Sequence, residues 1–305
     1  MTEAAGREAK TDAAAPLSAS HRLEALAAGA AFALFRALPL GAASALGGFV
    51  ARTIGPRLGI ARRAEKNLRR AFPDWPEARV RAVARQAWDN LGRTAAEYAK
   101  LDRIDCYAAG GRVRVSGVEH LDQLRDDGKA GIFFSGHLAN WEVMPLAGAQ
   151  RGLPISLVYR GANNPAVDDM ILQARRAITD SNIPKGASGA RQLIGIVRSG
   201  GHVAILVDQK LNDGIAVPFF GRMAMTAPAI AQLALKFDIP LVPVSCVRRQ
   251  GARFEVTFHP PLDVPRTGDR AADTLAIMTK VNTMIEGWIR ANPGQWLWLH
   301  RRWPD

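Results

Sequence analysis

The chain has 305 residues, 48% of them hydrophobic, so it is long enough to bury one large core or two smaller ones. Its formal net charge of +12 indicates an acidic partner, which composition alone leaves open between nucleic acid, anionic lipid and an acidic protein. The two cysteines, Cys106 and Cys246, lie far apart and in no metal-binding spacing, so we expect a reduced chain without a disulfide framework.

The N-terminal region predicts a tail followed by a membrane-associated helical segment. Residues 1–20 lack an apolar period and predict a disordered tail. Residues 21–51 are long enough to cross a bilayer, but Arg36 and Pro39 interrupt the middle, and a central charge costs about 2.5–3.5 kcal/mol. We therefore expect a helix, or a hairpin broken at Pro39, lying in the membrane interface. The alternative is an Ala-rich helix packed in a soluble core.

The next segment, Arg52–Arg70, is strongly basic. It contains seven basic residues and a single acidic residue, Glu65. Basic side chains beside an apolar helix are attracted to anionic headgroups by about 1 kcal/mol each and favour the cytoplasmic side of a membrane. A solvated helix face is the alternative. We expect no nucleic-acid partner, because stacking aromatics and a recognised binding motif are missing from this sequence.

The rest of the chain predicts an α/β fold. Residues 77–101 have the apolar period of an amphipathic helix, and from Arg112 onward short strands alternate with helices. This alternation favours a mixed central sheet with helices on both faces, in addition to the N-terminal membrane-associated helices. The expected strands are 113–116, 131–134, 155–159, 203–207, 241–247 and 254–259, and the expected helices are 119–125, 141–151, 165–179, 190–198, 227–237 and 269–291.

Three of the expected strands end in polar side chains. His137 follows the strand over 131–134, Arg160 follows the next, and Asp208 with Gln209 follows a third. Ligands of such sheets bind beyond the carboxyl ends of the strands. The sequence therefore predicts a site at this edge, although each residue alone is also compatible with an ordinary polar turn.

His137 and Glu142 form the candidate catalytic pair. Positions five apart on a helix point about 140° away from each other, so the two side chains would not share a helix face. We therefore place His137 in the strand-to-helix turn and Glu142 one turn into the helix, from which its carboxylate bends back to hold the imidazole. An oriented imidazole that accepts a hydroxyl proton is a general base. The alternative is a turn histidine and a helix-start glutamate without chemistry.

Two aromatic segments remain ambiguous in the sequence. Phe219 and Phe220, in an expected loop over residues 212–225, either line an apolar groove or enter the core. Thr226 is expected to cap the following helix. The segment 293–303 holds three tryptophans and two arginines, which suit a membrane-interface belt or equally a tail pinned onto the domain.

Taken together and in order, these motifs resemble one known family. They are His137-x-x-x-x-Glu142, Tyr159-Arg160 with Asn164-Pro165, Asp208-Gln209, Phe219-Phe220-Gly221 and the Trp-rich segment 295–303. From about residue 23 to residue 303, the chain resembles the lipid A biosynthesis acyltransferases, the late lauroyl and myristoyl transferases of Gram-negative bacteria. That family is related in fold to the glycerolipid acyltransferases.

The resemblance implies transfer of a fatty acyl chain from acyl carrier protein to a hydroxyl of the Kdo-modified lipid A precursor. It places the reaction on the cytoplasmic face of the inner membrane, with anionic lipids as further partners. It also implies a membrane anchor over residues 21–51, an acyltransferase domain over 52–305, and no metal or cofactor beyond the thioester co-substrate. The residues it assigns are His137, Glu142, Arg175 and Asp208 for catalysis, and Arg160, Asn164, Gln209, Phe219, Phe220 and Arg176 for substrate binding.

On this basis, His137 removes the proton from a 3-hydroxyl, Glu142 fixes the imidazole tautomer, and backbone amides or Arg175 stabilise the oxyanion. Asp208 is expected to orient Arg175 or substrate. Two other functions stay open. One is acyl transfer to another lysolipid or glycolipid, with acyl-CoA as a possible donor. The other is a non-enzymatic basic protein that binds membranes or nucleic acid.

Overall fold

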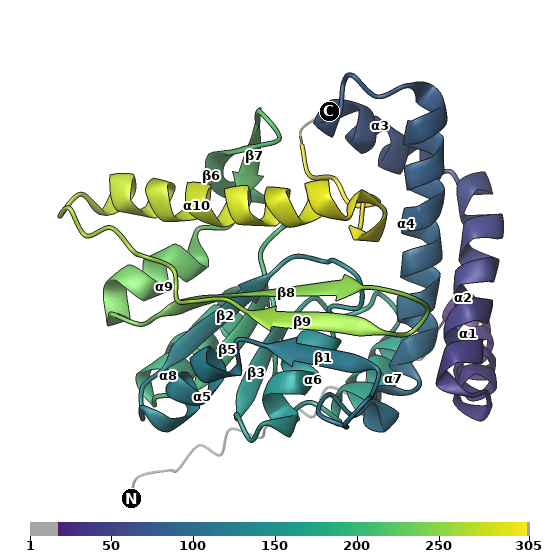
Figure 1. The fold of residues 1–305 in the computed structure, drawn as a ribbon, viewed down its shortest axis with the longest axis horizontal. Coiled ribbons are helices and arrows are strands. Elements are labelled where there is room, and N and C mark those ends of the chain that lie inside the picture. Colours follow the sequence, from purple (N-terminus) through teal and green to yellow (C-terminus); the bar gives the residue numbers. More distant parts are fainter. Residues whose placement is uncertain (1–17, 304–305) are drawn as a thin grey trace, which may run out of the picture.

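The computed structural model describes residues 18–303 (Figure 1). The expected disordered tail over 1–20 therefore lies mostly outside the described residues. Its last three residues were predicted wrongly, because helix α1, Ala19–Ala37, begins there. The side chain of Ser18 caps this helix by accepting a hydrogen bond from the amide of His21.

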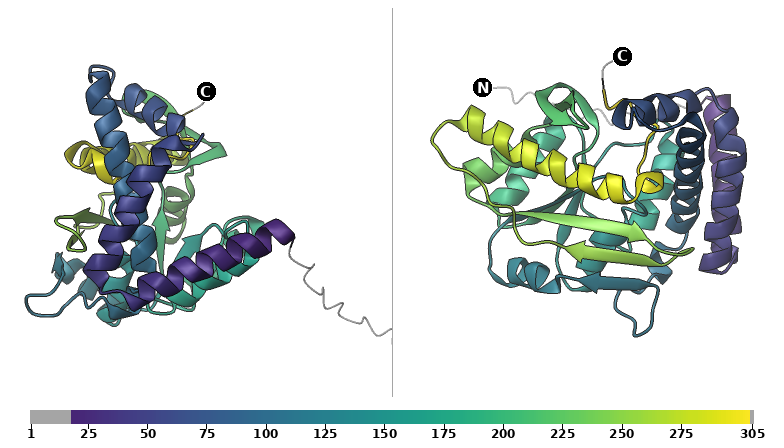
Figure 2. Two further views of the ribbon diagram at one scale, coloured as in Figure 1. Left: turned by 90° about the vertical axis from the view of Figure 1, so that its right-hand side faces the viewer. Right: turned by 45° about the horizontal axis from the view of Figure 1, so that its top comes forward.

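The N-terminal segment breaks at Pro39, as one of the sequence interpretations expects, but its two helices diverge from the break and do not pack as a hairpin (Figure 2). Helix α2, Leu40–Ile54, packs along α4, Glu77–Tyr98 (Figure 2). Gly47 and Gly92 lie at this contact, where a Cβ on either residue would overlap the backbone of the other. In contrast, α1 has no buried residue.

Within residues 18–303, no helix is both long enough and apolar enough to span a bilayer. The anchoring role of residues 21–51 and the domain boundary at 51 stay predictions. The short helix η1, Gly55–Arg57, and helix α3, Ala61–Ala71, connect α2 to α4, and η2, Leu101–Arg103, follows α4.

The centre of the molecule is the mixed, mostly parallel sheet that the sequence predicts. Its seven strands lie in the order β1-β9-β8-β2-β5-β3-β4, and every neighbouring pair is parallel except β8 and β9. The order differs from the chain order, since β5 lies between β2 and β3. The strands are β1 Val113–Ser116, β2 Gly131–Ser135, β3 Ile155–Tyr159, β4 Asn182–Pro184, β5 His202–Leu206, β8 Leu241–Arg248 and β9 Phe254–Phe258.

Helices cover both faces of the sheet, because successive side chains of each strand point to opposite sides. Ile132 and Phe134 of β2 enter the core formed with α8, α9 and α10, whereas Phe133 enters the core formed with α5 and α6. Figure 1 shows α9 and α10 on one side of the strands and α5 and α6 on the other. These helices are α5 Val118–Asp126, α6 Val143–Gln150, α7 Pro165–Arg175, α8 Ala187–Arg198, α9 Ala229–Phe237 and α10 Arg270–Ala291.

The expected loop over residues 212–225 is wrong, since this segment forms a hairpin of β6, Lys210–Phe219, and β7, Arg222–Thr226. Phe220 and Gly221 make its turn, both with positive φ, as a two-residue hairpin turn requires. Thr226 ends β7 and does not cap α9, whose N-cap position is Pro228.

The C-terminal tryptophans lie in the core. Trp296, Trp298 and Trp303 are all buried, and Arg302 is buried with them, donating to the carbonyl of Met225. The segment follows the short helix η3, Pro293–Gln295. Because none of these indoles reaches the surface, the membrane-belt interpretation is wrong and the pinned-tail alternative is confirmed.

Both cysteines are free, as the sequence predicts, and the structure shows that both are buried. Burial raises the pKa of the Cys106 thiol and of the Cys246 thiol to about 12. We expect neither thiol to react with Ellman's reagent at pH 8 in the folded protein, and both to react in denaturant, because the thiolate is the reactive form. Rapid labelling of the folded protein would show that one of these pockets opens.

Candidate active site

The site forms where β2 and β5 end side by side. The parallel register pairs Ser135 with Leu206, so the residues two positions beyond each strand end also meet. These residues are His137 and Asp208, and their side chains are joined by a 2.7 Å contact between Nδ1 and Oδ1. Gly136 leaves room for this approach, since a Cβ there would lie 3.1 Å from Oδ2 of Asp208.

The Asp208 carboxylate is buried and fully engaged. Its Oδ2 accepts hydrogen bonds from the backbone amide of His137 and from Nε1 of Trp296, both at 2.7 Å. Burial alone would raise the pKa of Asp208, but the charge and hydrogen bonds of His137 hold this pKa below its usual range. An ionised carboxylate accepts the Nδ1 proton of the imidazole, which leaves Nε2 as the acceptor nitrogen.

Glu142 has different partners from those expected. It occupies the N-cap position of α6, and its carboxylate accepts hydrogen bonds from Nε of Arg175 at 3.0 Å and from the hydroxyl of Tyr98. The expectation that Glu142 fixes the His137 tautomer is therefore wrong, because the β2–β5 register supplies Asp208 instead. The expectation that Asp208 orients Arg175 is wrong for the same reason.

The Glu142–Arg175–Tyr98 group is a second buried polar cluster beside the imidazole. Burial would lower the pKa of Arg175, but the charge of Glu142 raises it above its ordinary value. Burial raises the pKa of Tyr98, whose hydroxyl stays protonated and donates to the carboxylate. The guanidinium is thus held as a fixed positive charge near His137.

A hollow of about 310 Å³ lies over the His137 imidazole. Gln209 places its Nε2 3.4 Å from Nε2 of His137, and Lys185 donates to Oε1 of Gln209 at 3.1 Å. Burial lowers the pKa of Lys185. Arg160 and Arg175 also line this hollow, so its polar wall is mainly cationic.

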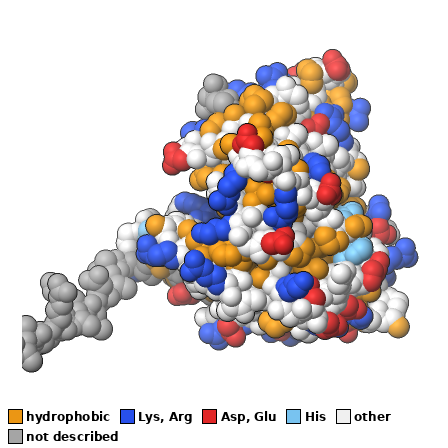
Figure 3. Space-filling model, turned by 90° about the vertical axis from the view of Figure 1, so that its left-hand side faces the viewer, with side chains coloured by type: hydrophobic (Ala, Val, Ile, Leu, Met, Phe, Trp, Pro, Cys, Tyr) orange, Lys and Arg blue, Asp and Glu red, His pale blue; other side chains and the backbone are white. Residues whose placement is uncertain are grey.

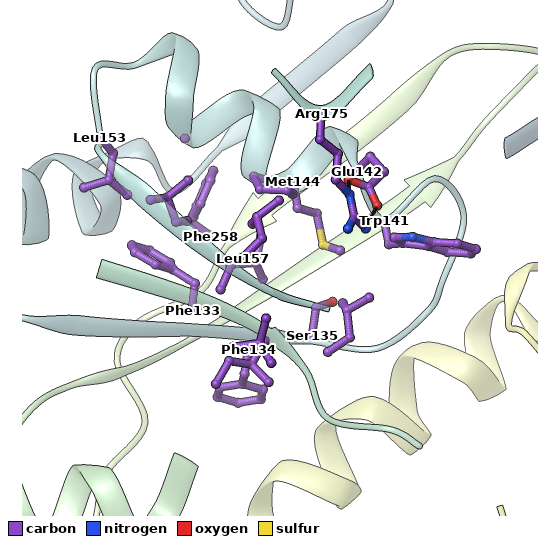
Figure 4. Close-up of a pocket in the computed structure, with 18 residues that line it drawn as sticks. Phe133, Phe134, Ser135, Trp141, Glu142, Met144, Leu153, Leu157, Arg175 and Phe258 are labelled. Atoms are coloured by element: carbon purple, nitrogen blue, oxygen red, sulfur yellow. Dashed lines mark hydrogen bonds and ion pairs between the residues drawn. The ribbon is translucent and has the colours of Figure 1, made fainter. Parts of the chain in front are cut away.

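Two apolar spaces share lining residues with this hollow, and Trp141 lines all three. One is a narrow pocket of about 50 Å³ between the sheet and α6. Figure 4 shows Trp141, Glu142 and Arg175 at one end of this pocket, with Phe133 and Leu153 toward the other. The second is a groove of about 410 Å³ between α1, α4 and α7, lined by residues that include Phe32, Phe35, Leu91, Ala95, Met170 and Ile171.

The six residues expected to bind substrate lie in different parts of the structure, and only two of them line the hollow. Arg160 and Gln209 line the hollow. Phe219 and Phe220 lie in the core, which settles their ambiguity against a groove.

Asn164 and Arg176 also lie away from the hollow. Asn164 caps α7 and donates to the carbonyl of His21, so it attaches α1 to α7. Arg176 is exposed, with Asp180 at 3.9 Å as its nearest acid.

Sequence reasoning missed several residues of the site. Tyr98 and Trp141 were treated as parts of helices, although both line the hollow. Lys185 lies between β4 and α8, in a stretch of the sequence that carries no motif. Nε1 of Trp296 donates to the carboxylate of Asp208, and Nε2 of His300 lies 3.1 Å from the main-chain carbonyl oxygen of Asp208. Only their position in the Trp-rich C-terminal motif pointed to them.

The described residues, 18–303, contain no group of three or more His, Cys, Asp or Glu side chains placed to hold a metal ion. The geometry supplies an imidazole whose acceptor nitrogen Nε2 lies at the hollow beside the Gln209 amide, together with a fixed guanidinium and adjoining apolar space. This combination suits proton abstraction from a hydroxyl next to an apolar chain.

Comparison with known proteins points in the same direction. The family model described as bacterial lipid A biosynthesis acyltransferase matches residues 18–305. A lipid A biosynthesis acyltransferase of Haemophilus influenzae is 24% identical over 250 residues, which cover 78% of this chain and 73% of that protein. A lipid A biosynthesis myristoyltransferase of Escherichia coli is 25% identical, covering 80% and 75%. A phosphatidylinositol mannoside acyltransferase of Mycolicibacterium smegmatis is 23% identical, covering 90% and 89%.

Proposed function

The chain belongs to the bacterial lipid A biosynthesis acyltransferases, and from that premise we propose that it moves a fatty acyl chain from acyl carrier protein to a hydroxyl of the Kdo-modified lipid A precursor. The observation that carries the proposal is the His137–Asp208 pair, which faces a hollow bordered by two apolar spaces. The enzyme is an O-acyltransferase, and the pair supplies the general base that O-acylation needs.

In the proposed reaction, Nε2 of His137 accepts the proton of the substrate hydroxyl. The oxygen bonds to the thioester carbonyl carbon, the carbon–sulfur bond breaks, and the thiolate takes the proton from the imidazolium. Asp208 keeps the imidazole oriented and stabilises its positive charge. General-base catalysis of this kind contributes roughly 100- to 10,000-fold to the rate.

Arg175 is proposed to stabilise the developing oxyanion. Its guanidinium has five N–H donors, of which Glu142 and Tyr98 occupy only some, and it lines the hollow beside His137. A fixed cation in a partly dry site stabilises negative charge more than water does. In this proposal Glu142 and Tyr98 are positioning residues for Arg175.

The groove between α1, α4 and α7 is proposed to hold a substrate acyl chain. The narrow pocket near α6 accommodates roughly four water-sized groups, too few for a long acyl chain without side-chain movement. The groove has about eight times that volume and an almost wholly apolar wall. It connects to the hollow at His137 through four shared lining residues, Leu91, Tyr98, Trp141 and Ile171.

We expect Ala95→Phe to lower kcat/KM about 60-fold, because a ring in the groove displaces about three methylenes worth about 0.8 kcal/mol each. The assay is acyl transfer in detergent micelles. Ala78→Phe, on an exposed position of the same helix outside the groove, is the matched control and should leave activity unchanged. Equal activity of both variants would contradict the proposal that the groove holds the acyl chain.

We also propose that the enzyme works at the cytoplasmic face of the inner membrane, on anionic lipid. Large apolar side chains are exposed along α1 and α2, including Leu23 and Leu26 at 71% each and Phe49 at 54%. The side of the molecule away from α2, shown in Figure 3, instead has hydrophobic side chains interspersed with charges of both signs.

Replacing Leu23 and Leu26 together by Asp should lower binding to anionic vesicles about 100-fold, because each leucine contributes at least about 1.5 kcal/mol when it enters lipid. Co-sedimentation measures this binding. Leu275→Asp, an exposed leucine on α10, is the control. Substitution is preferable to truncation, because Ser44 of α2 donates a buried hydrogen bond to Glu97. If the double variant still sedimented with the vesicles as well as the unaltered protein does, the proposal that α1 contacts the membrane would be rejected.

The overall proposal is tested with purified enzyme, a panel of acyl carrier protein and coenzyme A thioesters, and several acceptors. We expect transfer from the carrier protein thioester to the lipid A precursor. Transfer only to another glycolipid would favour the alternative function, acyl transfer to a different lysolipid or glycolipid. The similarity to a phosphatidylinositol mannoside acyltransferase is the observation that supports this alternative. No transfer to any acceptor would reject the proposed reaction.

A further inference from the structure

A second cationic hollow lies between α2, η1, α3 and α4, away from the hollow at His137. We propose that it binds the phosphate of an anionic membrane lipid. Its volume is about 340 Å³, and its charged lining consists of four arginines and one glutamate, namely Arg52, Arg57, Arg81, Arg85 and Glu65. Figure 2 shows α2, α3 and the beginning of α4 side by side in this region.

Part of this charge is compensated within the protein. Arg52 pairs with Asp89 at 2.5 Å, and Arg81 lies 3.7 Å from Glu77. Glu65, the only acid in the lining, is itself paired with an arginine outside the hollow at 3.0 Å. The lining is therefore positive even after these pairs are counted.

Arg57 and Arg85 provide the charge that remains available. Within residues 18–303, neither guanidinium has a carboxylate within 4.0 Å, and both side chains are exposed. Arg57 donates only to the main-chain carbonyl of Thr53. Guanidinium groups present paired N–H donors that match two oxygens of a phosphate, so two arginines across a hollow suit such a group.

The hollow is preformed. Gly55 lies against Trp88 so closely that a Cβ would overlap the indole ring, and this contact fixes η1 on α4. Trp88 is buried and lines the hollow together with Pro56 and Ala84. Arg57 and Arg85 thus extend from two elements that are held together, and a ligand would not have to order either backbone.

Exposed apolar side chains close to Arg57 in the chain favour a lipid over a soluble anion or an acidic protein. Ile54 and Leu58, which flank Arg57 in the chain, are 53% and 47% exposed. A headgroup phosphate in the hollow would place its acyl chains beside these apolar side chains. The two hollows share no lining residue, and Arg85 is six residues along α4, or about 9 Å, from Leu91 of the catalytic hollow, so this phosphate would lie outside the catalytic hollow.

The test measures binding of full-length protein to phosphatidylcholine vesicles with and without phosphatidylglycerol. Arg57→Ala combined with Arg85→Ala should bind the anionic vesicles about 30-fold more weakly, from about 1 kcal/mol per lost charge. The control combines Arg114→Ala with Arg191→Ala, two exposed arginines elsewhere, and should stay within about twofold of the unaltered protein. An equal loss in the control would show general electrostatic attraction and overturn the site.

Three further measurements separate the alternatives. His137→Ala should bind vesicles normally, so a failure of the catalytic proposal does not affect this one. If inorganic phosphate bound the hollow as tightly as the vesicles do, the ligand of the hollow would be a soluble anion. If the double variant bound acyl carrier protein more weakly but bound vesicles normally, the hollow would be a contact site for the carrier protein. Either result overturns the lipid assignment.

Discussion

Asp208→Asn is expected to lower kcat about 10,000-fold while the protein stays folded. The asparagine amide would donate to Nδ1 of His137, which forces the imidazole proton onto Nε2. That nitrogen could then no longer accept the substrate proton. The effect should appear in kcat, measured with saturating thioester and lipid acceptor, and circular dichroism should show an unchanged fold.

Glu142→Gln is the control that separates the two carboxylates. Glutamine retains an oxygen for Arg175 and does not contact the imidazole, so we expect a smaller loss than for Asp208→Asn. His137→Ala should be as inactive as Asp208→Asn. The opposite order, with Glu142→Gln inactive and Asp208→Asn nearly normal, would contradict the assignment of Asp208 as the imidazole partner.

Arg248→Met is expected to destabilise the protein by about 3–5 kcal/mol in the free energy of unfolding. Arg248 donates to both carboxylate oxygens of Glu97, at 2.5 and 3.0 Å, and to Asn90 at 2.8 Å. Glu97 is wholly buried, so loss of the arginine leaves its charge without compensation. Urea denaturation measures the change.

A neighbouring pair provides the control for this prediction. Arg249 pairs with Glu255 at the surface, so Arg249→Met should change stability by less than about 1 kcal/mol. Arg248→Met combined with Glu97→Gln should recover part of the loss, because no buried charge remains. A double variant as unstable as the sum of its single changes would mean that the ion pair is not the cause.

Much of the fold could be predicted because its elements carry local signals. The runs Ile132–Phe134 and Leu241–Val247 are largely apolar on both faces, as is typical of strands that helices cover on both sides. The β6–β7 hairpin was missed because its turn is Phe220-Gly221 rather than a common turn pair. The C-terminal tryptophans had two compatible interpretations, since the same composition suits a membrane belt and a core, and only packing distinguishes them.

The sequence by itself determined which residues stand at strand ends, because apolar runs and the polar residues that stop them are local features. His137, Arg160, Asp208 and Gln209 were identified in that way, and all four lie at the hollow or contact a residue that lines it. The tertiary structure decided which carboxylate meets the imidazole. Asp208 is 71 residues from His137 in the chain, and only the insertion of β5 beside β2, in the register that aligns Ser135 with Leu206, brings the two together. Strand order and register arise from packing across the whole sheet, so the five-residue spacing to Glu142 carried no information about them.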